Sequence, residues 1–420
     1  MSAMSSNWDR RSVLRAAAGL AALGPLAACG GNNGRGGGSG SGKSLSQYFH
    51  AYGEPGVEQA VKKYASAYKG ANVGTQWITS NDYETKLFAA LLTSNAPDVF
   101  EFHPQIQMVK SGQVADLSDI INPVKDDFNP ADITSHTYDG KIYGVRMIDD
   151  PQFFFYRKSM LEKAKVGVPT TLEELIEAAA KLTTSKVKGL FLGNDLHAIE
   201  APLIWSAGAE PLNAKNEIAY HTDAVAAGLG QLRKLFTSGH LLLDAPADYW
   251  DPSAITQGLC AIQFCGMWAM PAMQKALGDD LGVFPFPKVG SNGRPSVYNG
   301  GWSMFVNAKG KNVDAAKEYV KWLWIDQKKY QEDFATSYGF HIPPRTSIAA
   351  SADKLKSGLP AEGAKLFTDY GHFDNISWTQ AMWSALDAVI SDCVRKGGSP
   401  EAALDKADKT INRELKKLFG

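Results

Sequence analysis

Residues 153–193 read FFFYRKSMLEKAKVGVPTTLEELIEAAAKLTTSKVKGLFLG, and this stretch decides the fold class. Its two ends, 153–156 and 189–193, are short apolar runs typical of strands. Between them, Thr170 and Glu173 form the capping box expected at the start of a helix. Apolar residues then recur at helical spacing, at Leu172, Leu175, Ile176, Ala179 and Leu182. Strand, helix and strand in succession predict an α/β protein.

The same alternation extends along the chain from Leu45. Further strands are expected at 48–52, 73–78, 98–102, 260–265 and 302–307. One further helix is expected to begin near Asp314. Another carries an apolar stripe on one face, made of Met382, Leu386, Val389, Ile390 and Cys393. These elements predict more than one α/β lobe.

Composition limits the function. The chain has 420 residues, 43 Lys plus Arg against 44 Asp plus Glu, and a net charge of -1. A chain without excess positive charge offers no general attraction for nucleic acid, so no nucleic-acid partner is expected. The 10 Trp, 15 Tyr and 19 Phe are the more unusual resource, because aromatic faces serve recognition of uncharged ligands.

The first 28 residues have the pattern of an export signal. Arg10, Arg11 and Arg15 precede a charge-free apolar run, 16–28, which is too short for the roughly 20 residues that span a bilayer. The run ends in Leu-Ala-Ala followed by Cys29, as in a lipoprotein signal peptide, so we expect cleavage before Cys29 and a lipid on its sulfur. The Arg-Arg-Ser-Val-Leu sequence from Arg10 resembles a twin-arginine signal, although Val13 in place of Phe leaves Sec export open.

Residues 29–44 are expected to form a flexible tether rich in Gly and Ser. Within it, Gly37, Gly42, Lys43 and Ser44 match the phosphate-loop pattern. That pattern binds phosphate only between a buried strand and a helix, and here a strand-like run follows it. We therefore interpret the match as a coincidence of composition.

Several short motifs carry a resemblance that covers nearly the whole chain. They are APDVF at 96–100, DGKIYGV at 139–145, YRK at 156–158, VPTTLEEL at 168–175, GGW at 300–302 and AAKEYVKWL at 315–323. In this order and coupled to Cys29, they resemble the family 1 extracellular solute-binding proteins, the sugar-capturing lipoproteins of ABC importers. The chain is similar to maltose- and oligosaccharide-binding proteins in particular.

The resemblance implies a two-lobed periplasmic-binding-protein fold of type II, with the ligand in a cleft between the lobes. The chain would cross between lobes three times, near 149–152, 298–303 and 343–351. The N-terminal lobe would comprise 45–150 plus 303–345, and the C-terminal lobe 151–302 plus 346–420.

The same resemblance implies a monomeric, non-enzymatic sugar-binding protein without a cofactor. It would be held at the outer face of the cell membrane by lipid on Cys29 and would deliver sugar to permease subunits, with the ATPase as an indirect partner. No H-E-x-x-H or G-x-S-x-G motif occurs, but paired carboxylates of a glycosidase have no sequence signature. A surface-anchored carbohydrate-active enzyme, or a sensing or adhesion lipoprotein without a permease, therefore stays open as the alternative.

A buried sugar requires aromatic rings for its C–H faces and polar groups for its hydroxyls. In the first lobe, the family places acidic ligands near Glu54 and Asp150, with Asp149 competing with Asp150. It places a stacking ring at Phe102. Because side chains alternate along a strand, either Glu101 or Phe102 is expected to face the cleft.

In the second lobe the resemblance points to stacking tryptophans at Trp268 and Trp383. Asp387 lies four residues after Trp383, so both share one helix face. The other candidates are Trp205, Trp250, Gly301, Trp302 and Arg345, with Trp378 as a second choice to Trp383. A core position is the alternative for Trp205, Trp268 and Trp302, a loop position for Trp250, a tight turn for Gly301 and a surface salt bridge for Arg345.

Overall fold

The computed structural model describes residues 43–420. The expected signal peptide, Cys29, and the tether up to residue 42 lie outside the described residues. Strand β1 begins at Ser44, so the residue that ends the phosphate-loop pattern enters a strand and not a helix.

The first sheet has the strand order β2-β1-β3-β12-β6. Strands β1, β2 and β3 are parallel to one another, whereas β12 is antiparallel to both of its neighbours, β3 and β6. The strands are β1 (Ser44–His50), β2 (Asn72–Ile78), β3 (Val99–Phe102), β6 (Val145–Ile148) and β12 (Trp302–Val306). A strand from late in the chain therefore lies inside a sheet built mainly from its beginning.

The second sheet has the order β13-β11-β7-β9-β8, with β10 also paired to β7. Strand β7 reads PQFFFYR and is buried along its first five residues, because helices cover both of its faces. The strands are β7 (Pro151–Arg157), β8 (Lys188–Phe191), β9 (Cys260–Gly266), β10 (Leu281–Phe284), β11 (Val297–Asn299) and β13 (Gly371–Phe373). A separate two-stranded sheet joins β4 (Thr137–Tyr138) to β5 (Lys141–Ile142).

Two of the passages between the sheets are only two residues long. Asp149 and Asp150 join β6 to β7, and Gly300 and Gly301 join β11 to β12. Gly301 is required by space, because a Cβ atom there would lie 2.4 Å from the carbonyl oxygen of Ile148. The two passages consequently run close together.

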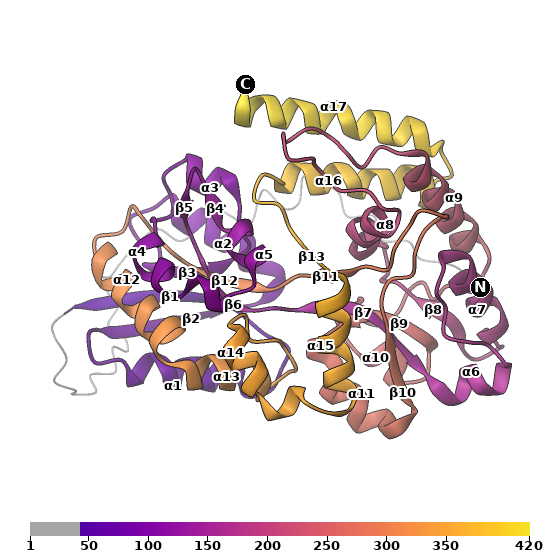
Figure 1. Cartoon of the computed structure of the whole chain (residues 1–420), viewed down its shortest axis with the longest axis horizontal. Coiled ribbons are helices and arrows are strands. Elements are labelled where there is room, and N and C mark those ends of the chain that lie inside the picture. The colour runs from indigo at the N-terminus through magenta and orange to yellow at the C-terminus, as the bar shows by residue number, and fades with distance from the viewer. Residues whose placement is uncertain (1–42) are drawn as a thin grey trace, which may run out of the picture. The chain divides into compact units, whose positions relative to one another are not determined.

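Helices pack beside both sheets (Figure 1), with α1 and α12 against the first sheet and α7 and α15 against the second. Those within or next to segments of the first sheet are α1 (Val57–Ala67), α2 (Ser80–Leu91), α3 (Ile106–Lys110), α4 (Ser118–Ile121), α5 (Pro130–Ser135), α12 (Val313–Lys321), α13 (Lys328–Thr336) and α14 (Thr346–Ser351). Those among the strands of the second are α6 (Lys158–Ala164), α7 (Leu172–Leu182), α8 (Glu200–Ser206), α9 (Asp223–Thr237), α10 (Ser253–Thr256), α11 (Met270–Leu277), α15 (Gly358–Tyr370), α16 (Gln380–Val389) and α17 (Pro400–Phe419). Short 3-10 turns η3 (His197–Ile199) and η4 (Met267–Ala269) precede α8 and α11.

The start of α7 corrects one detail of the sequence analysis. Thr171, not Thr170, is the N-cap, and its hydroxyl accepts a hydrogen bond from the backbone N–H of Glu174. Glu174 in turn accepts from the backbone N–H and the hydroxyl of Thr170. The N-cap bond lies one residue later than expected, because Thr-Thr-Leu-Glu-Glu fits the pattern in two registers. The carboxylate of Glu174 accepts from the residue before the N-cap and not from the N-cap itself, as it would in a standard capping box.

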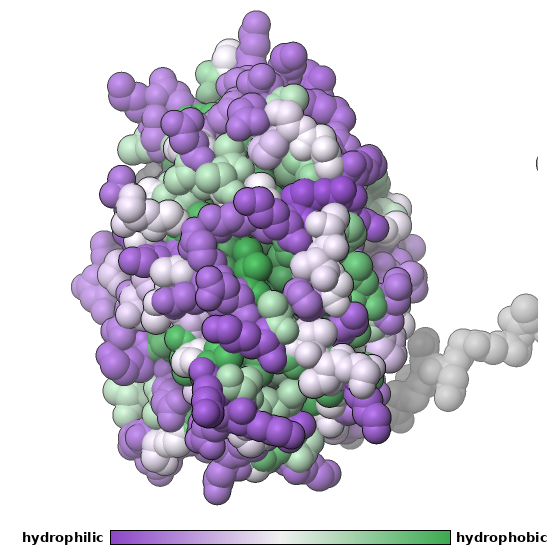
Figure 2. Space-filling view, turned by 90° about the vertical axis from the view of Figure 1, so that its right-hand side faces the viewer, coloured by the Kyte–Doolittle hydropathy of each residue, from purple (hydrophilic) through white to green (hydrophobic). Residues whose placement is uncertain are grey.

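The described surface mixes hydrophilic and hydrophobic residues. On the face drawn in Figure 2, hydrophilic residues predominate and hydrophobic ones gather in a hollow near the middle. The large hydrophobic side chains that are exposed are scattered along the chain, at Leu92, Val168, Trp250 and Phe419. Among residues 43–420, no helix combines the length and apolar character needed to cross a bilayer.

Candidate functional site

A cavity of about 350 Å³ is lined by residues that come from both sheets and their helices. From the first sheet come the ends of β1 and β3 and the start of β12, at His50, Phe102 and Trp302. From the other side come β7, α8 and α16. The cavity thus lies where strand ends and connections of the two lobes meet, a usual place for a small-molecule site.

Aromatic rings form the wall on the first-sheet side. The indole of Trp302 stacks on His50 at a centroid distance of 4.0 Å and lies 4.4 Å from His103. His50 is fixed from behind, because buried Glu101 accepts hydrogen bonds from its backbone N–H (2.5 Å) and ring Nδ1 (2.6 Å). The hydroxyl of Tyr52 donates to the other oxygen of Glu101 at 2.6 Å. Glu101 therefore positions the wall and does not line it.

His103 is neutral at pH 7. Burial first, and then the charges of Arg146 and His50, lower the pKa of His103 to about 4. Its Nδ1 lies 3.0 Å from the carbonyl oxygen of Gly301, so the Nδ1–H of the neutral ring donates there. The remaining ring nitrogen, Nε2, is then an acceptor.

The opposite wall combines two tryptophans with two carboxyl groups. Trp378 and Trp383 meet edge to face, with centroids 5.7 Å apart. Glu200, at the start of α8, and Asp387, on α16, line the same cavity. Burial, followed by the proximity of Asp387, raises the pKa of Glu200 well above its ordinary value.

Several buried polar atoms of the lining lack a partner among the described residues. They are Oε1 of Gln152, Oε1 of Glu200, Oδ1 of Asp374 and Nε1 of Trp378. Folded proteins leave few such atoms unpaired, because each one forfeits its hydrogen bonds to water. Four in one cavity indicate a site whose polar groups are completed by a ligand or by water.

Beneath the cavity, Arg146 neutralises a buried acidic cluster. Its Nε lies 2.8 Å from Asp132 and 3.6 Å from Asp149, and all three side chains are almost fully buried. Burial is the main reason that the pKa values of both aspartates are raised. The same guanidinium opposes the effect of burial on Asp374 in the lining, the pKa of which is raised to about 6.

His341 joins two acidic residues at the passage between the sheets. Its Nδ1 contacts Asp150, and its Nε2 lies 3.1 Å from Glu54. Burial alone would lower the pKa of His341, but the two carboxylates outweigh it and raise the pKa to about 10. We call these three side chains, His341, Asp150 and Glu54, the His341 clasp.

The His341 clasp makes stability depend on pH. Because the pKa of His341 rises from 6.5 to about 10 on folding, the protonated ring stabilises the fold fully below about pH 6.5. This contribution is lost as the pH rises from there through about 10. We expect the difference in unfolding free energy between the wild type and His341→Asn, measured in urea, to shrink over this window. A difference that stays constant from pH 6 to 10 would contradict the charged clasp.

Four of the twelve predicted ligand residues line the cavity: Phe102, Trp302, Trp383 and Asp387. Glu54 and Asp150 belong to the His341 clasp, and Asp149 to the Arg146 cluster. Gly301 contributes its carbonyl to His103.

The remaining predicted residues lie away from the cavity. Trp205 is 1% exposed, as expected for a helix, α8, whose residues are all buried. Its indole Nε1–H donates a hydrogen bond to the carboxylate of Glu210. Arg345 is buried, and its Nε lies 2.7 Å from Oδ2 of Asp127. It therefore forms an ion pair, which was the alternative to ligand binding for this residue. Trp268 packs in the second lobe and donates its Nε1–H to the backbone oxygen of Trp250, while the ring of Trp250 is 47% exposed.

Sequence reasoning missed most of the polar lining. His50 lies inside the expected strand 48–52 and gave no separate signal. Glu200 interrupts an otherwise apolar run, Ala198 to Ile204, so a lone acid in an apolar helix was an available signal. Gln152, Tyr298 and Asp374 carried no signal, because they meet only through the pairing of β7, β11 and β13. Trp250 was the predicted residue, but its neighbour in the sequence, Tyr249, is the one that lines the cavity.

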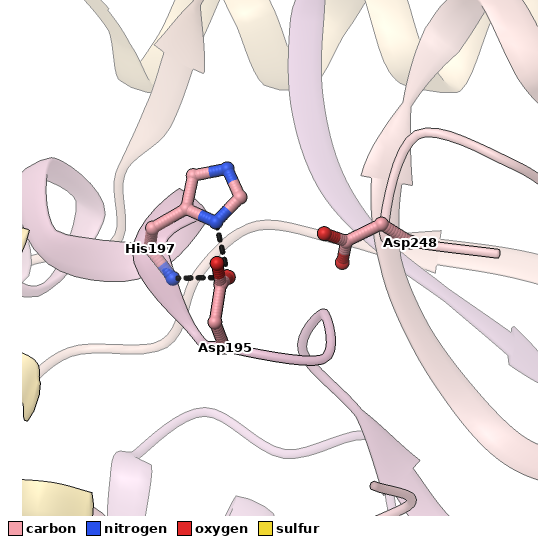
Figure 3. A group of neighbouring side chains, drawn as sticks. All are labelled: Asp195, His197 and Asp248. Atoms are coloured by element: carbon pink, nitrogen blue, oxygen red, sulfur yellow. Dashed lines mark hydrogen bonds and ion pairs between the residues drawn. The ribbon is translucent and has the colours of Figure 1, made fainter. Parts of the chain in front are cut away.

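One group beside the cavity has the composition of a cation site. Asp195, His197 and Asp248 bring ligand atoms within 4.8 Å of one another (Figure 3). Their bonds give them a structural role. Asp195 accepts from the backbone and ring of His197, and Asp248 accepts from the backbone N–H groups of Asn194 and Tyr249. The group fixes the loop that carries His197 to the cavity.

The sequence is similar to those of known binding proteins. The model of the family described as bacterial extracellular solute-binding protein matches residues 50–324. A diacetylchitobiose-binding protein, DasA of Streptomyces coelicolor, is 26% identical over 417 residues, covering 93% of this chain and 95% of that protein. A galactooligosaccharide-binding protein of Bacillus subtilis is 24% identical, covering 69% of this chain and 70% of that protein.

Among solved structures, the chain is similar to the GacH receptor of Streptomyces glaucescens, solved unliganded and in complex with acarbose. The TM-score is 0.78 at 22% identity, and the match covers 90% of this chain and 99% of the receptor. The expected two-lobed α/β fold is confirmed by this likeness.

Proposed function

Because this chain belongs to the bacterial extracellular solute-binding proteins, we propose that it captures an oligosaccharide outside the cytoplasm for an ABC importer. The observation that carries the proposal is the cavity itself. Three indole rings, Trp302, Trp378 and Trp383, border it together with polar atoms that have no partner in the described part of the chain. Rings suit the C–H faces of pyranoses and the polar atoms suit their hydroxyls.

The mechanism we propose is closure of the two lobes around the sugar. Phe102 and Trp302 belong to the first sheet and Trp383 to a helix beside the second, so one bound sugar would bridge both. A ligand that contacts both lobes stabilises the closed form and shifts the population toward it. The short passages at Asp149 and Gly300 are the hinge positions in this proposal, and the closed form is the one that would dock on a permease.

Membrane attachment through lipid on Cys29 is part of the proposal. Its support is the lipoprotein pattern of the first 29 residues and the Gly-rich segment that follows. A tether of this composition leaves the lobes free to reorient toward a permease.

The binding proposal is tested by calorimetry with malto-, galacto-, manno- and chito-oligosaccharides. We expect one class to bind, and at about 100 times its Kd to stabilise the protein by about 2.7 kcal/mol in thermal unfolding. Solution scattering with the same ligand should give a smaller radius of gyration. An unchanged radius at saturation would contradict closure, and the absence of binding to every class would contradict the proposed function.

The enzymatic alternative is tested with the same sugars. Glu200 and Asp387 are two carboxyl groups in one cavity, which is the composition of a glycosidase site. We expect no new reducing ends after prolonged incubation with the ligand that binds. Hydrolysis that disappears in Glu200→Gln would instead favour the enzyme.

A further inference from the structure

The charge of the cavity lining is one-sided. Four carboxyl groups line the cavity, at Glu84, Glu200, Asp374 and Asp387. Among the described residues the lining contains neither lysine nor arginine, and its only basic side chains are His50, His103 and His197. Arg146 lies beneath the cavity, but its charge is already matched by Asp132 and Asp149. A neutral ligand would bring no cation to these carboxyl groups.

Glu200 is the acidic group for which this matters most. Its side chain belongs to a residue only 6% exposed, and its Oε1 has no hydrogen-bond partner among the described residues. The rest of α8 is Ala-Pro-Leu-Ile-Trp-Ser and is buried throughout, so no neighbour on the helix supplies a charge. A buried carboxyl beside a second carboxyl is unfavourable unless a proton or another cation comes between them.

The unpartnered atoms of the lining have the same bias. Counted over residues 43–420, Gln152, Glu200 and Asp374 each offer a lining oxygen without a hydrogen-bond partner, whereas Trp378 offers the one unpartnered donor of the lining. A hydroxyl brings one donor together with acceptor lone pairs, but an ammonium brings three donors and no acceptor. Trp378 and Trp383 add ring faces, which attract cations.

We propose that the ligand is an oligosaccharide bearing a basic, protonated amine, and that Glu200 and Asp387 hold this amine. This proposal rests on the proposed function. The ammonium would donate to Oε1 of Glu200, which lacks a partner, and would take the place of the proton between the two carboxyl groups. The ligand class is therefore amino sugars with a free amine, as distinct from their acylated or hydroxyl counterparts.

Three disaccharides of one linkage test the proposal, since they differ only at the second carbon of each ring. They are β-1,4-linked glucosamine disaccharide, its diacetylated form and cellobiose, with the corresponding monosaccharides as linkage-free probes. We expect the free amine to bind roughly 10- to 100-fold more tightly than the hydroxyl form at neutral pH, as for a charged hydrogen bond in a buried site. Equal or weaker binding of the amine would overturn the proposal.

Charge-neutral variants separate recognition of the amine from recognition of the sugar. Glu200→Gln and Asp387→Asn should each abolish most of the preference for the amine, because they weaken binding of the free-amine disaccharide more than binding of the neutral one. Glu177→Gln, an exposed residue of α7 outside the lining, is the matched control and should keep the full preference. A preference that survives both cavity variants would overturn the assignment to these carboxyl groups.

Proton release gives a readout that a merely structural role of Glu200 would not change. Because the pKa of Glu200 is raised, binding of an ammonium should expel up to about one proton, detected by calorimetry in buffers of different ionisation enthalpy. Neutral sugars, and the amine on Glu200→Gln, should expel less. The titratable groups near Glu200 are Asp387, Asp195, His197, Tyr249 and Tyr220.

The outcomes also distinguish the two proposals. Binding of a neutral oligosaccharide, with no amine preferred over it, leaves the proposed function intact and rejects the amine. Absence of binding to every sugar, charged or neutral, rejects both.

Discussion

Replacing Trp383 with alanine is expected to weaken oligosaccharide binding by roughly 1–3 kcal/mol, the range measured for stacking of a ring on an aromatic side chain. Trp383 is half-buried, lies on the cavity face of α16 and meets Trp378 edge to face. Its removal takes away both a stacking surface and the support of the second ring. The measurement is the Kd by calorimetry, with the best ligand of the oligosaccharide panel.

The matched control is Trp322→Ala. Trp322 is also half-buried and packs on Tyr68 at 5.1 Å, but it does not line the cavity. Its loss should lower stability and leave the Kd of the folded protein unchanged. If Trp383→Ala reduces stability without changing the Kd, Trp383 is a packing residue and the cavity is not where the sugar stacks.

Replacing Arg146 with methionine is expected to destabilise the fold by about 3–5 kcal/mol, the usual effect of removing one partner from a buried ion pair. Arg146 is the cation shared by Asp132 and Asp149, and methionine keeps much of its volume. Without the guanidinium, two buried carboxyl groups must stay protonated or be desolvated as anions. The measurement is the urea midpoint, read at an unchanged m-value.

The loss caused by Arg146→Met should grow as the pH rises. The pKa values of Asp132 and Asp149 are already raised in the fold, so their protonated forms stabilise it at low pH and this contribution is lost on deprotonation. Arg157→Met is the control, because its pair with Asp280 is partly exposed and should contribute no more than about 1 kcal/mol. Equal losses for the two variants would contradict a special role for the buried cluster.

The secondary structure could be predicted because it depends on local pattern. The expected strands 73–78 and 260–265 differ from β2 and β9 by one residue at one end, and the apolar spacing from Leu172 to Leu182 coincides with α7. The cap of α7 was placed one residue early, since two threonines and two glutamates satisfy the same pattern. The family, too, could be recognised, because short motifs in a fixed order survive at low identity.

The pattern of residues by itself placed two site residues together only where one element carries both, whereas Phe102 and Trp302 came from the family resemblance and the neighbouring glycine. Trp383 and Asp387 share a helix face, and that periodicity alone placed them together. Trp205 lies in the core, the alternative for this residue, because only the start of α8 borders the cavity. For Glu101, strand alternation could not reveal that His50 and Tyr52 would use both of its oxygens. The net charge of -1 is a sum over the whole chain, so it could not reveal that carboxyl groups gather in one cavity.

The position of β12 has a consequence for how the protein is made. Strand β12 lies between β3 and β6, so both of these strands have an unpaired edge until synthesis has passed Val306. By then all of the strands of the second sheet except β13 have been synthesised. Insertion of one late strand between two early ones is a non-local event, and such events are slow and leave sheet edges open to aggregation. Completion of the first sheet is therefore expected to limit the rate of folding, and the nascent chain to need protection of these edges until then.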